Sequence, residues 1–395
     1  LAREGDAPAG SARRLPFVFF AIRPGEAPAY QNVRKTRTLG IRPAFVGEFE
    51  VKDHHFPQGD VISQGRQAWD AAVDTVNFGK FFLGFGSVGI CEHAFGEALA
   101  HVRHRVLYGK SVLEMPHIRR AITLAFARLT AMKFFAYRAL DYWQAASAGE
   151  RRYLLWAAVQ KAKVSTEGVK VMALLSECVG ARGFEAQTYF ESALRDVPLI
   201  PALEGSTHIN FALTARFIDA YLAGTAGVPA VESLLPHQGD PGENPCWLRG
   251  PDRNPKTVRF GHFLEAFRPL RSVPNVRRFV KQVKAFRQFA ADGMPAMNPS
   301  GDAGLVIAIG RCFSTIAYAQ LVAENCQAAN VENSTVSVLF HPLIEDLTEE
   351  SLRLAGLYPT GSPQRAVLRN TGRIPATSNS ELDALAGLIA ARWTA

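Results

Sequence analysis

The sequence contains few cysteines and no pattern that would pair them. Among its 395 residues there are five, they are widely spaced, and no CxxC pair occurs. They are Cys91, Cys178, Cys246, Cys312 and Cys326. Secreted disulfide frameworks use an even number of cysteines, and zinc sites use closely spaced pairs. We therefore expect reduced thiols in a cytosol-like compartment, with neither disulfides nor zinc.

The sequence also lacks long hydrophobic runs, a signal peptide and internal repeats. No apolar run reaches about 18 residues without a charge, and the nearest one, from Ala303, is interrupted by Arg311. We therefore expect no transmembrane helix. Leu1 begins neither a signal peptide nor an initiator sequence, so we expect that an N-terminal part of the protein precedes this chain. No metal site is predicted, because His101 and His104 share no face pattern with Cys91 that suggests tetrahedral ligation.

What the sequence does contain is typical of a globular protein with a sizeable core. Its hydrophobic content is 48%, and its length suits two or three domains. The net charge of +8 suits an anionic ligand or surface. Spread over this length, the charge fits a ligand's pyrophosphate as well as nucleic acid.

Hydrophobic patterning predicts a mainly α fold with a small β portion. Residues 1–60 have the pattern of β structure: residues 15–22 are apolar, and residues 44–53 alternate, with Phe45, Phe49 and Val51 on one face of a half-buried strand. From Trp69 to Gly224 the pattern becomes helical. Two stripes mark long helices that pack as an antiparallel bundle. They are Ile118, Ile122, Ala125, Leu129, Met132, Ala136 and Leu140, beginning after Pro116, and Leu155, Val159, Ala162, Val169 and Met172, ending near Gly180.

Beyond the bundle the sequence predicts a linker and a second helical block. Residues 225–256 carry six prolines among glycines and aspartates, which is the composition of a linker or an irregular lid. Val276, Val280, Val283 and Phe286 then mark one side of a helix that Asp292-Gly293 would close. The other side of this helix is basic, with Arg277, Arg278, Lys281, Lys284 and Arg287. Thr348 and Ser380 resemble N-caps of two later helices.

The segment with the strongest chemical signal is Leu203-Glu204-Gly205-Ser206-Thr207. Two nearby prolines in the preceding residues 197–202 predict an extended approach. Behind the segment, apolar residues at four-residue spacing predict one face of a helix that stops at Gly224; they are Ile209, Leu213, Phe217 and Tyr221. Ser206 or Thr207 can cap this helix, and Gly205 allows close approach to the main chain. Taken alone, Glu204 is a helix-start acid favoured by the macrodipole.

One glycine pattern is rejected as a dinucleotide fingerprint. Residues 84–89 match GxGxxG, but no carboxylate lies between Glu97 and Glu114, where a ribose-binding acid is required. No βαβ alternation follows either. We interpret these glycines as close helix packing.

The Glu204 segment resembles the catalytic-base loop of the acyl-CoA dehydrogenase family, in which an apolar residue precedes Glu, Gly, Thr or Ser, a polar residue and Ile. His208 stands where the family commonly has Gln or Asn. The resemblance implies that Glu204 is the catalytic base, that Gly205 contacts substrate, and that Ser206 and His208 contact FAD.

Two further segments resemble flavin-contact motifs of that family. Residues 105–109 are similar to its Arg-x-x-Phe-Gly motif, with Tyr108 in place of Phe, and they imply that Arg105 and Tyr108 contact flavin. Pro116 departs from the Gln that commonly follows downstream. Residues 177–183 are similar to the glycine-rich turn that reaches the flavin of a neighbouring subunit. This turn implies roles for Glu177, Gly180 and Ala181, and it implies an oligomer, a homodimer or a homotetramer.

A fourth segment, residues 77–80, resembles the Asn-x-Gly-Arg motif of the very-long-chain members. It implies that Asn77 and Lys80 contact the substrate near the CoA thioester, although Lys80 lacks the planar fork of arginine. The resemblance also implies a division into four parts. Residues 1–62 are the second half of the small β domain, and residues 63–224 are the four-helix bundle with the catalytic Glu and the flavin contacts. Residues 225–256 are the linker, and residues 257–395 are a C-terminal helical extension.

The implied activity is FAD-dependent α,β-desaturation of a long-chain acyl-CoA, with an electron-transfer flavoprotein or a similar acceptor. An acyl-CoA oxidase is the closest alternative, because only the fate of the reduced flavin differs. A flavin-containing protein that binds DNA or a membrane surface through the basic helix is another. We favour the interpretation that the charges of this helix form a solvated face over the interpretation that they bind nucleic acid. If the helix has a binding role, we favour peripheral contact with a membrane. The implied location is a bacterial cytoplasm or, in a eukaryote, the mitochondrial matrix.

Overall fold

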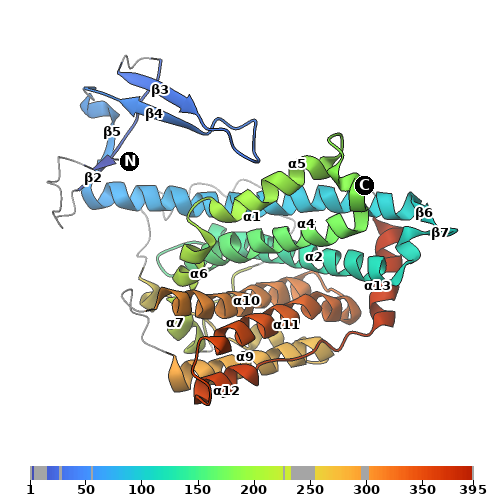
Figure 1. Ribbon diagram of the computed structural model, residues 1–395. Helices are drawn as coiled ribbons and strands as arrows, with labels where there is room; N and C mark the ends of the chain where they lie inside the picture. The colour runs from blue at the N-terminus through green and yellow to red at the C-terminus, as the bar shows by residue number, and fades with distance from the viewer. Residues whose placement is uncertain are drawn as a thin grey trace.

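A computed structural model describes residues 2–3, 16–25, 29–54, 57–225, 227–232, 254–294 and 302–393. The predicted linker therefore lies mostly outside the described residues, as do Leu15 and Cys246. The described chain is dominated by long helices stacked in layers, with two small sheets at one end and a short two-stranded hairpin at the other (Figure 1). This confirms the prediction of a mainly α fold with a small β portion. The division into four domains stays a prediction.

The β portion consists of two small antiparallel sheets near the start of the chain. One joins β1 (Ala2–Arg3), β2 (Phe17–Phe20) and β5 (Val61–Gln64), and the other pairs β3 (Tyr30–Lys35) with β4 (Gly47–Val51). The prediction of a half-buried strand at residues 44–53 is wrong in one respect. Phe45 and Phe49 are 64% and 58% exposed, because no described element covers that face of the two-stranded sheet.

Helix α1 (Gly65–His104) spans the whole molecule (Figure 1). It begins a few residues before Trp69, where the sequence pattern becomes helical. The rejected GxGxxG pattern lies inside it. The packing interpretation holds for Gly84, where a Cβ would lie 2.2 Å from the Gln160 amide nitrogen, but at Gly86 and Gly89 nothing lies within 4 Å.

Further helices complete the bundle, and α2, α3, α4 and α5 among them pack against α1. Their bounds are α2 (Pro116–Gln144), α3 (Tyr153–Val159), the π-helical segment η3 (Gln160–Val164), α4 (Ser165–Val179), α5 (Tyr189–Asp196), α6 (Thr207–Ala215) and α7 (Ile218–Leu222). Both predicted stripes lie on helices, and α4 ends at Gly180, as predicted. The predicted helix from Ile209 to Gly224 is wrong, because α6 and α7 are separate and Ile209 is 57% exposed.

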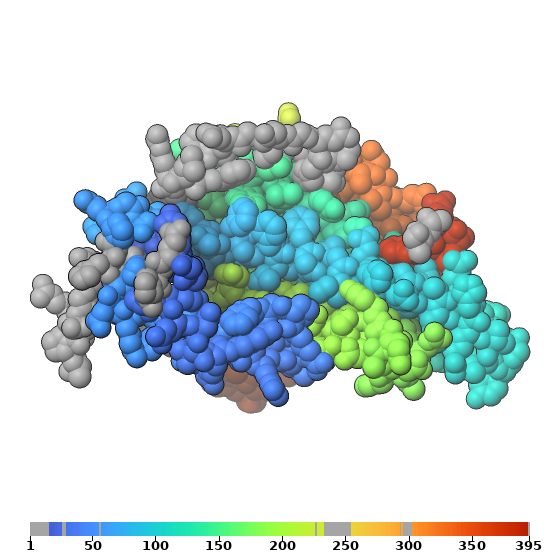
Figure 2. All heavy atoms as spheres, turned by 90° about the horizontal axis from the view of Figure 1, so that it is seen from above, coloured from blue at the N-terminus to red at the C-terminus, as the bar shows by residue number. Residues whose placement is uncertain are grey.

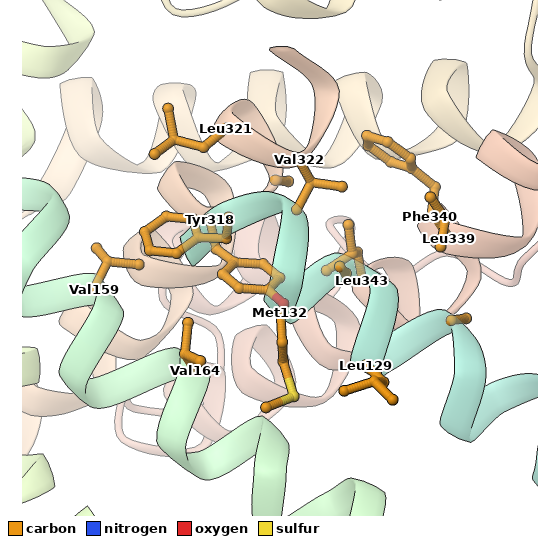
Figure 3. Packing of buried hydrophobic residues seen from close by; sticks show 14 of the residues in the cluster. Leu129, Met132, Val159, Val164, Tyr318, Leu321, Val322, Leu339, Phe340 and Leu343 are labelled. Carbon is orange, nitrogen blue, oxygen red and sulfur yellow. The ribbon is translucent and has the colours of Figure 1, made fainter. Parts of the chain in front are cut away.

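The C-terminal block is formed by α9 (Pro274–Gly293), α10 (Ala303–Ala328), α11 (Asn333–Gly356), α12 (Pro363–Arg369) and α13 (Asn379–Arg392). Its helices share one hydrophobic core with the bundle. Figure 3 shows Met132 and Leu129 from α2 facing Tyr318 and Val322 from α10 and Leu343 from α11.

Two sequence expectations for this block are wrong. Thr348 lies within α11, and Ser378, not Ser380, caps α13, because its side chain accepts from the Glu381 N–H. In addition, α10 is long and apolar enough to cross a membrane by length and composition despite Arg311. Since 67% of its most apolar window is buried inside the protein, a core position accounts for its composition.

A buried ion network fastens the C-terminal block to the bundle. Asp346 of α11 accepts from Arg128 of α2 at 3.0 Å and from Lys163 of η3 at 2.6 Å. Glu167 of α4 accepts from the same two cations at 2.6 and 2.9 Å. Lys170 completes the network with a contact of 2.8 Å to Asp346. Because buried charges are tolerated only when they are paired, this network fixes how the two helical layers meet.

Candidate active site

The loop that carries Glu204 connects a 3₁₀ turn to helix α6. The turn η5 (Val197–Ala202) contains Pro201, so the predicted extended approach is wrong. Glu204 and Gly205 both have positive φ, +49° and +82°. A left-handed conformation is uncommon for a residue with a Cβ, so the loop depends on contacts that hold it. We call residues 201–207 the base loop.

Polar contacts hold both ends of the base loop. The Ser206 hydroxyl caps α6 by accepting from the Ile209 N–H, as predicted. The buried Asn210 amide donates to the carbonyls of Gly205 and Ser206 at 3.0 and 3.1 Å. At the other end, the Thr207 hydroxyl donates to the Pro201 carbonyl at 2.9 Å. Glu204 is therefore presented from a loop that is tied down on both sides.

The Glu204 side chain lies against the backbone of α1 at Gly79. A Cβ added at Gly79 would lie 2.8 Å from both Cδ and Oε1 of Glu204. Glycine is therefore required for this approach, which the sequence analysis did not recognise. Glu204 and Gly205 are both exposed in the described chain.

Two buried lysines stand behind the base loop. Lys80 is 6% exposed and donates to the Asn77 side chain at 3.2 Å, so the predicted substrate residues Asn77 and Lys80 lie together beside Gly79. Burial lowers the pKa of Lys80 to about 8, although the Glu204 carboxylate opposes this. Lys161, which the sequence analysis missed, is fully buried and donates to the Pro201 carbonyl at 2.8 Å. The sequence signal that could have indicated a buried Lys161 is its position next to Ala162, which belongs to an apolar stripe.

Exposed aromatic side chains border this part of α1. Phe78 and Phe82 are 50% and 60% exposed and contact each other with ring centroids 4.7 Å apart. Phe78 also meets Trp143 of α2 edge-on at 5.1 Å. Large apolar side chains that remain exposed next to a carboxylate are typical of a surface that receives an apolar ligand.

A second group of predicted residues lies at the far end of α1. Arg105 is the residue that ends α1, and Tyr108 and Gly109 form the turn of a hairpin between β6 (Val106–Leu107) and β7 (Lys110–Ser111). Gly109, with φ +76°, therefore serves the turn of this hairpin. Tyr108 is 96% exposed.

Arg105 lines a pocket of about 580 Å³ between α1 and the start of α5. We call it the arginine pocket. It is also lined by Arg182, which lies in the turn η4 (Gly180–Phe184), and by His101 and His104 of α1. Among the described residues neither arginine forms an ion pair. Burial, together with Arg182 and Arg105, lowers the pKa of His101. Glu97 also lines the pocket, so its two guanidiniums outnumber its one carboxylate. The pocket therefore suits an anion, and a dinucleotide pyrophosphate is of the right charge.

The glycine-rich turn meets this pocket only in part. Glu177, Gly180 and Ala181 are exposed, and none of them lines the pocket. Gly180 has φ +65°, which ends α4 and turns the chain toward Arg182. Among the pocket residues that the sequence analysis did not single out as ligand contacts are Arg182 and His101. Their position is a consequence of how α4 packs on α1.

The base loop and the arginine pocket are far apart in one chain. Lys80 and Arg105 are 25 residues apart on one helix, so about 38 Å separates them at 1.5 Å per residue. Figure 2 shows α1 exposed along the surface between them, with the β strands beside its first half and α5 beside its second. Exposed His208, in the first turn of α6, belongs with the base loop. One cofactor molecule cannot contact both groups of the same chain.

Among the described residues, no cluster of three or more potential metal ligands occurs. Cys91, Cys178, Cys312 and Cys326 are free and buried.

Comparison with known proteins identifies the fold. Residues 67–218 match the family model described as "acyl-CoA dehydrogenase, C-terminal domain". This segment of the chain is an acyl-CoA dehydrogenase C-terminal domain. All the predicted site residues, from Asn77 to His208, fall within the matched range.

Individual members of the acyl-CoA dehydrogenase family are similar over part of the chain. Cyclohexane-1-carbonyl-CoA dehydrogenase of Geobacter metallireducens is 24% identical over 199 residues, 50% of this chain and 51% of that protein. A rat mitochondrial short/branched chain specific acyl-CoA dehydrogenase is 19% identical over 48% of this chain and 43% of that protein. The chain thus spans about half the length of these relatives.

A solved structure extends the likeness in fold to the C-terminal block. An acyl-CoA dehydrogenase from Bacillus anthracis, solved as a complex with FAD, superposes with a TM-score of 0.70 at 14% identity. The superposition covers 93% of this chain and 64% of that one. The helices after the linker therefore belong to an arrangement that an acyl-CoA dehydrogenase also adopts.

Proposed function

We propose that this chain is the helical part of an FAD-dependent acyl-CoA dehydrogenase that desaturates a long-chain acyl-CoA between its α and β carbons. The observation that carries the proposal is the Glu204 carboxylate, held against Gly79 on a loop fastened at both ends. The exposed rings of Phe78 and Phe82 beside it support an apolar acyl chain as ligand.

Glu204 is the base in this proposal. The α C–H bond of the thioester breaks and its proton passes to the Glu204 carboxylate, which needs close contact with the carbon to act. The negative charge that develops on the thioester oxygen needs N–H donors. The backbone N–H of Glu204 donates no hydrogen bond within the described residues and supports this role, and the Lys80 ammonium adds positive charge nearby. Asn77 orients that ammonium.

The arginine pocket fits a dinucleotide. Its two guanidiniums, Arg105 and Arg182, and its histidines would hold the pyrophosphate, while Tyr108, Glu177, Gly180 and Ala181 would border it. Bound FAD would supply the acceptor for the hydride that leaves the β carbon. Ser206 and His208 would contact the flavin end from the base loop.

The separation of the two groups supports an oligomer. Because the base loop and the arginine pocket lie about 38 Å apart, the pocket of one subunit would serve the base loop of another in a homodimer or homotetramer. An electron-transfer flavoprotein or similar acceptor would reoxidise the flavin. An acyl-CoA oxidase would use the same residues and differ only in passing electrons to oxygen.

A second role is supported by the basic face of α9. Arg277, Lys281, Lys284 and Arg287 are exposed, and the only acid on this helix is Asp292 at its end. Such a face suits peripheral contact with an anionic membrane surface that faces a bacterial cytoplasm or a mitochondrial matrix. Salt-sensitive pelleting with anionic vesicles tests it. Pelleting with DNA instead would favour the nucleic-acid alternative, and no pelleting with either leaves a solvated face.

The test of the dehydrogenase proposal is the visible spectrum of the FAD-loaded protein. Addition of a long-chain acyl-CoA without oxygen should bleach the flavin band. Glu204→Gln should keep the flavin and lose the bleaching, because the amide cannot take the proton. Undiminished bleaching in Glu204→Gln would remove Glu204 as the base, and an unbleached wild-type flavin would reject the activity.

A further inference from the structure

Lys161 is a fully buried cation that the proposed chemistry has not used. It lies on η3, where one π-helical turn interrupts the otherwise continuous helix from α3 to α4. A π turn is rare and shifts the side chains around it relative to an α-helix. Within this turn Lys163 reaches the ion network at Asp346, whereas Lys161 reaches the base loop.

The contact of Lys161 is with the first residue of the base loop. Its ammonium donates to the Pro201 carbonyl at 2.8 Å, and the Thr207 hydroxyl donates to the same oxygen at 2.9 Å. Pro201 lies three residues before Glu204. The Pro201 carbonyl thereby connects η3, the end of η5 and the first turn of α6. The hydrogen bond from Thr207 also joins the two ends of the base loop.

The base loop needs such a fixed point because it is exposed and has unfavourable torsions. Glu204 and Gly205 both have positive φ, and both are exposed. A non-glycine residue in this conformation persists where surrounding contacts determine it. A hydrogen bond donated by a cation is stronger than one from a neutral donor.

The charged groups around this point come from three elements. They are Lys80 from α1, Lys161 from η3 and Glu204 from the base loop. Burial and, to a smaller extent, Lys80 lower the pKa of Lys161, and Glu204 opposes both, so that the pKa is about 8. At neutral pH the Lys161 ammonium is therefore still the main form.

We propose that Lys161 is a positioning residue that sets where the Glu204 carboxylate meets the substrate, by holding the Pro201 carbonyl at the start of the base loop. This role rests on the proposed dehydrogenase function. Lys161 does not touch the substrate, since its side chain is buried behind the loop.

The experiment compares Lys161→Met with Lys170→Met in the FAD-loaded protein. Methionine keeps most of the length of the side chain and removes the donor. Lys170 is a matched control, because it is a lysine of the following helix whose partners are Asp346 and Glu167, not the base loop. Amide hydrogen exchange of the peptide covering residues 201–210 reports the loop. The rate of anaerobic flavin bleaching by acyl-CoA reports proton removal, and the acyl-CoA concentration giving half the maximal rate reports binding.

Lys161→Met should raise exchange in the base loop and slow bleaching by roughly tenfold to a hundredfold, with binding unchanged. Lys170→Met should leave all three as in the wild type. Unchanged loop exchange in Lys161→Met overturns the proposal, as does faster exchange with an unchanged bleaching rate. If the wild-type flavin is not bleached at all, the dehydrogenase function fails, and exchange alone still decides whether Lys161 holds the loop.

Thr207→Val provides a second variant in case Lys161→Met does not fold. It removes the other donor to the Pro201 carbonyl without leaving a buried charge unpaired. Loop exchange should rise and bleaching should slow, both less than in Lys161→Met. If Thr207→Val changes neither quantity, the Pro201 carbonyl is not the point that holds the loop.

Discussion

Gly79→Ala should damage the active site while leaving the fold intact. The added methyl would lie 2.8 Å from Cδ and Oε1 of Glu204 and 3.1 Å from its Cγ. Carbon atoms meet ordinary neighbours at about 3.4 Å or more, so the carboxylate must move by roughly 0.6 Å. Because the Glu204 side chain is exposed, it can move without disturbing the core.

The expected effects on stability and on rate have opposite signs. In a helix interior, alanine is favoured over glycine by about 1 kcal/mol, so the free energy of unfolding should stay the same or rise. Displacement of a base by about 1 Å can cost about a hundredfold, so we expect at least about a tenfold loss in the rate of flavin bleaching. A variant that is more stable and less active would separate the site from the fold.

Gly86→Ala is the matched control on the same helix. Gly86 is exposed and nothing lies within 4 Å of its added Cβ, so this variant should gain stability and keep the wild-type rate. Urea unfolding and anaerobic bleaching by acyl-CoA measure the two quantities. The reasoning is refuted if Gly79→Ala bleaches as fast as Gly86→Ala, or if it is strongly destabilised, because the carboxylate would then not be what yields.

Three further predictions concern the rest of the molecule. Adding ADP should raise the pKa of His101 toward its usual value, since an anion in the arginine pocket offsets the two guanidiniums; histidine ring NMR measures this, and an unchanged pKa at saturating ADP contradicts an anion site. Asp346→Asn should cost about 3–5 kcal/mol in urea unfolding at pH 7, because it leaves buried cations unpaired, and a loss below about 1 kcal/mol would show the network to be dispensable. Although burial opposes it, Lys163 and Arg128 hold the pKa of Asp346 well below its usual range, so its contribution is present above pH of about 4 and is lost as the pH falls below that. Burial raises the pKa of the Cys91 thiol to about 12, so iodoacetamide at pH 8 should label it only after unfolding, and rapid labelling of the folded protein would contradict its burial.

The sequence by itself determined which segments are helical and where the chemistry is concentrated. The apolar stripes of α2 and α3–α4 depend on a 3.6-residue period, and this period is visible in any amphipathic helix whatever it packs against. The Ser206 cap and the Gly180 helix end follow from local backbone needs in the same way. The motif around Glu204 could also be recognised from the sequence, because Glu204, Gly205 and the helix cap Ser206 are adjacent in the chain.

Only the tertiary structure decided how these parts meet. Gly79 and Glu204 are brought into contact by the packing of the base loop on α1, and no local pattern reports a contact between residues so far apart in sequence. In the sequence Lys161 resembles any other helical lysine, and only the π-helical segment η3 places its ammonium at the Pro201 carbonyl. Arg182 lies in the same pocket as Arg105 because α4 and α1 end side by side. The exposure of Phe45 and Ile209 was likewise misjudged, since a period shows which residues share a face but not whether another element covers that face. Helices and caps are thus set by neighbours along the chain, whereas the site is set by neighbours across it.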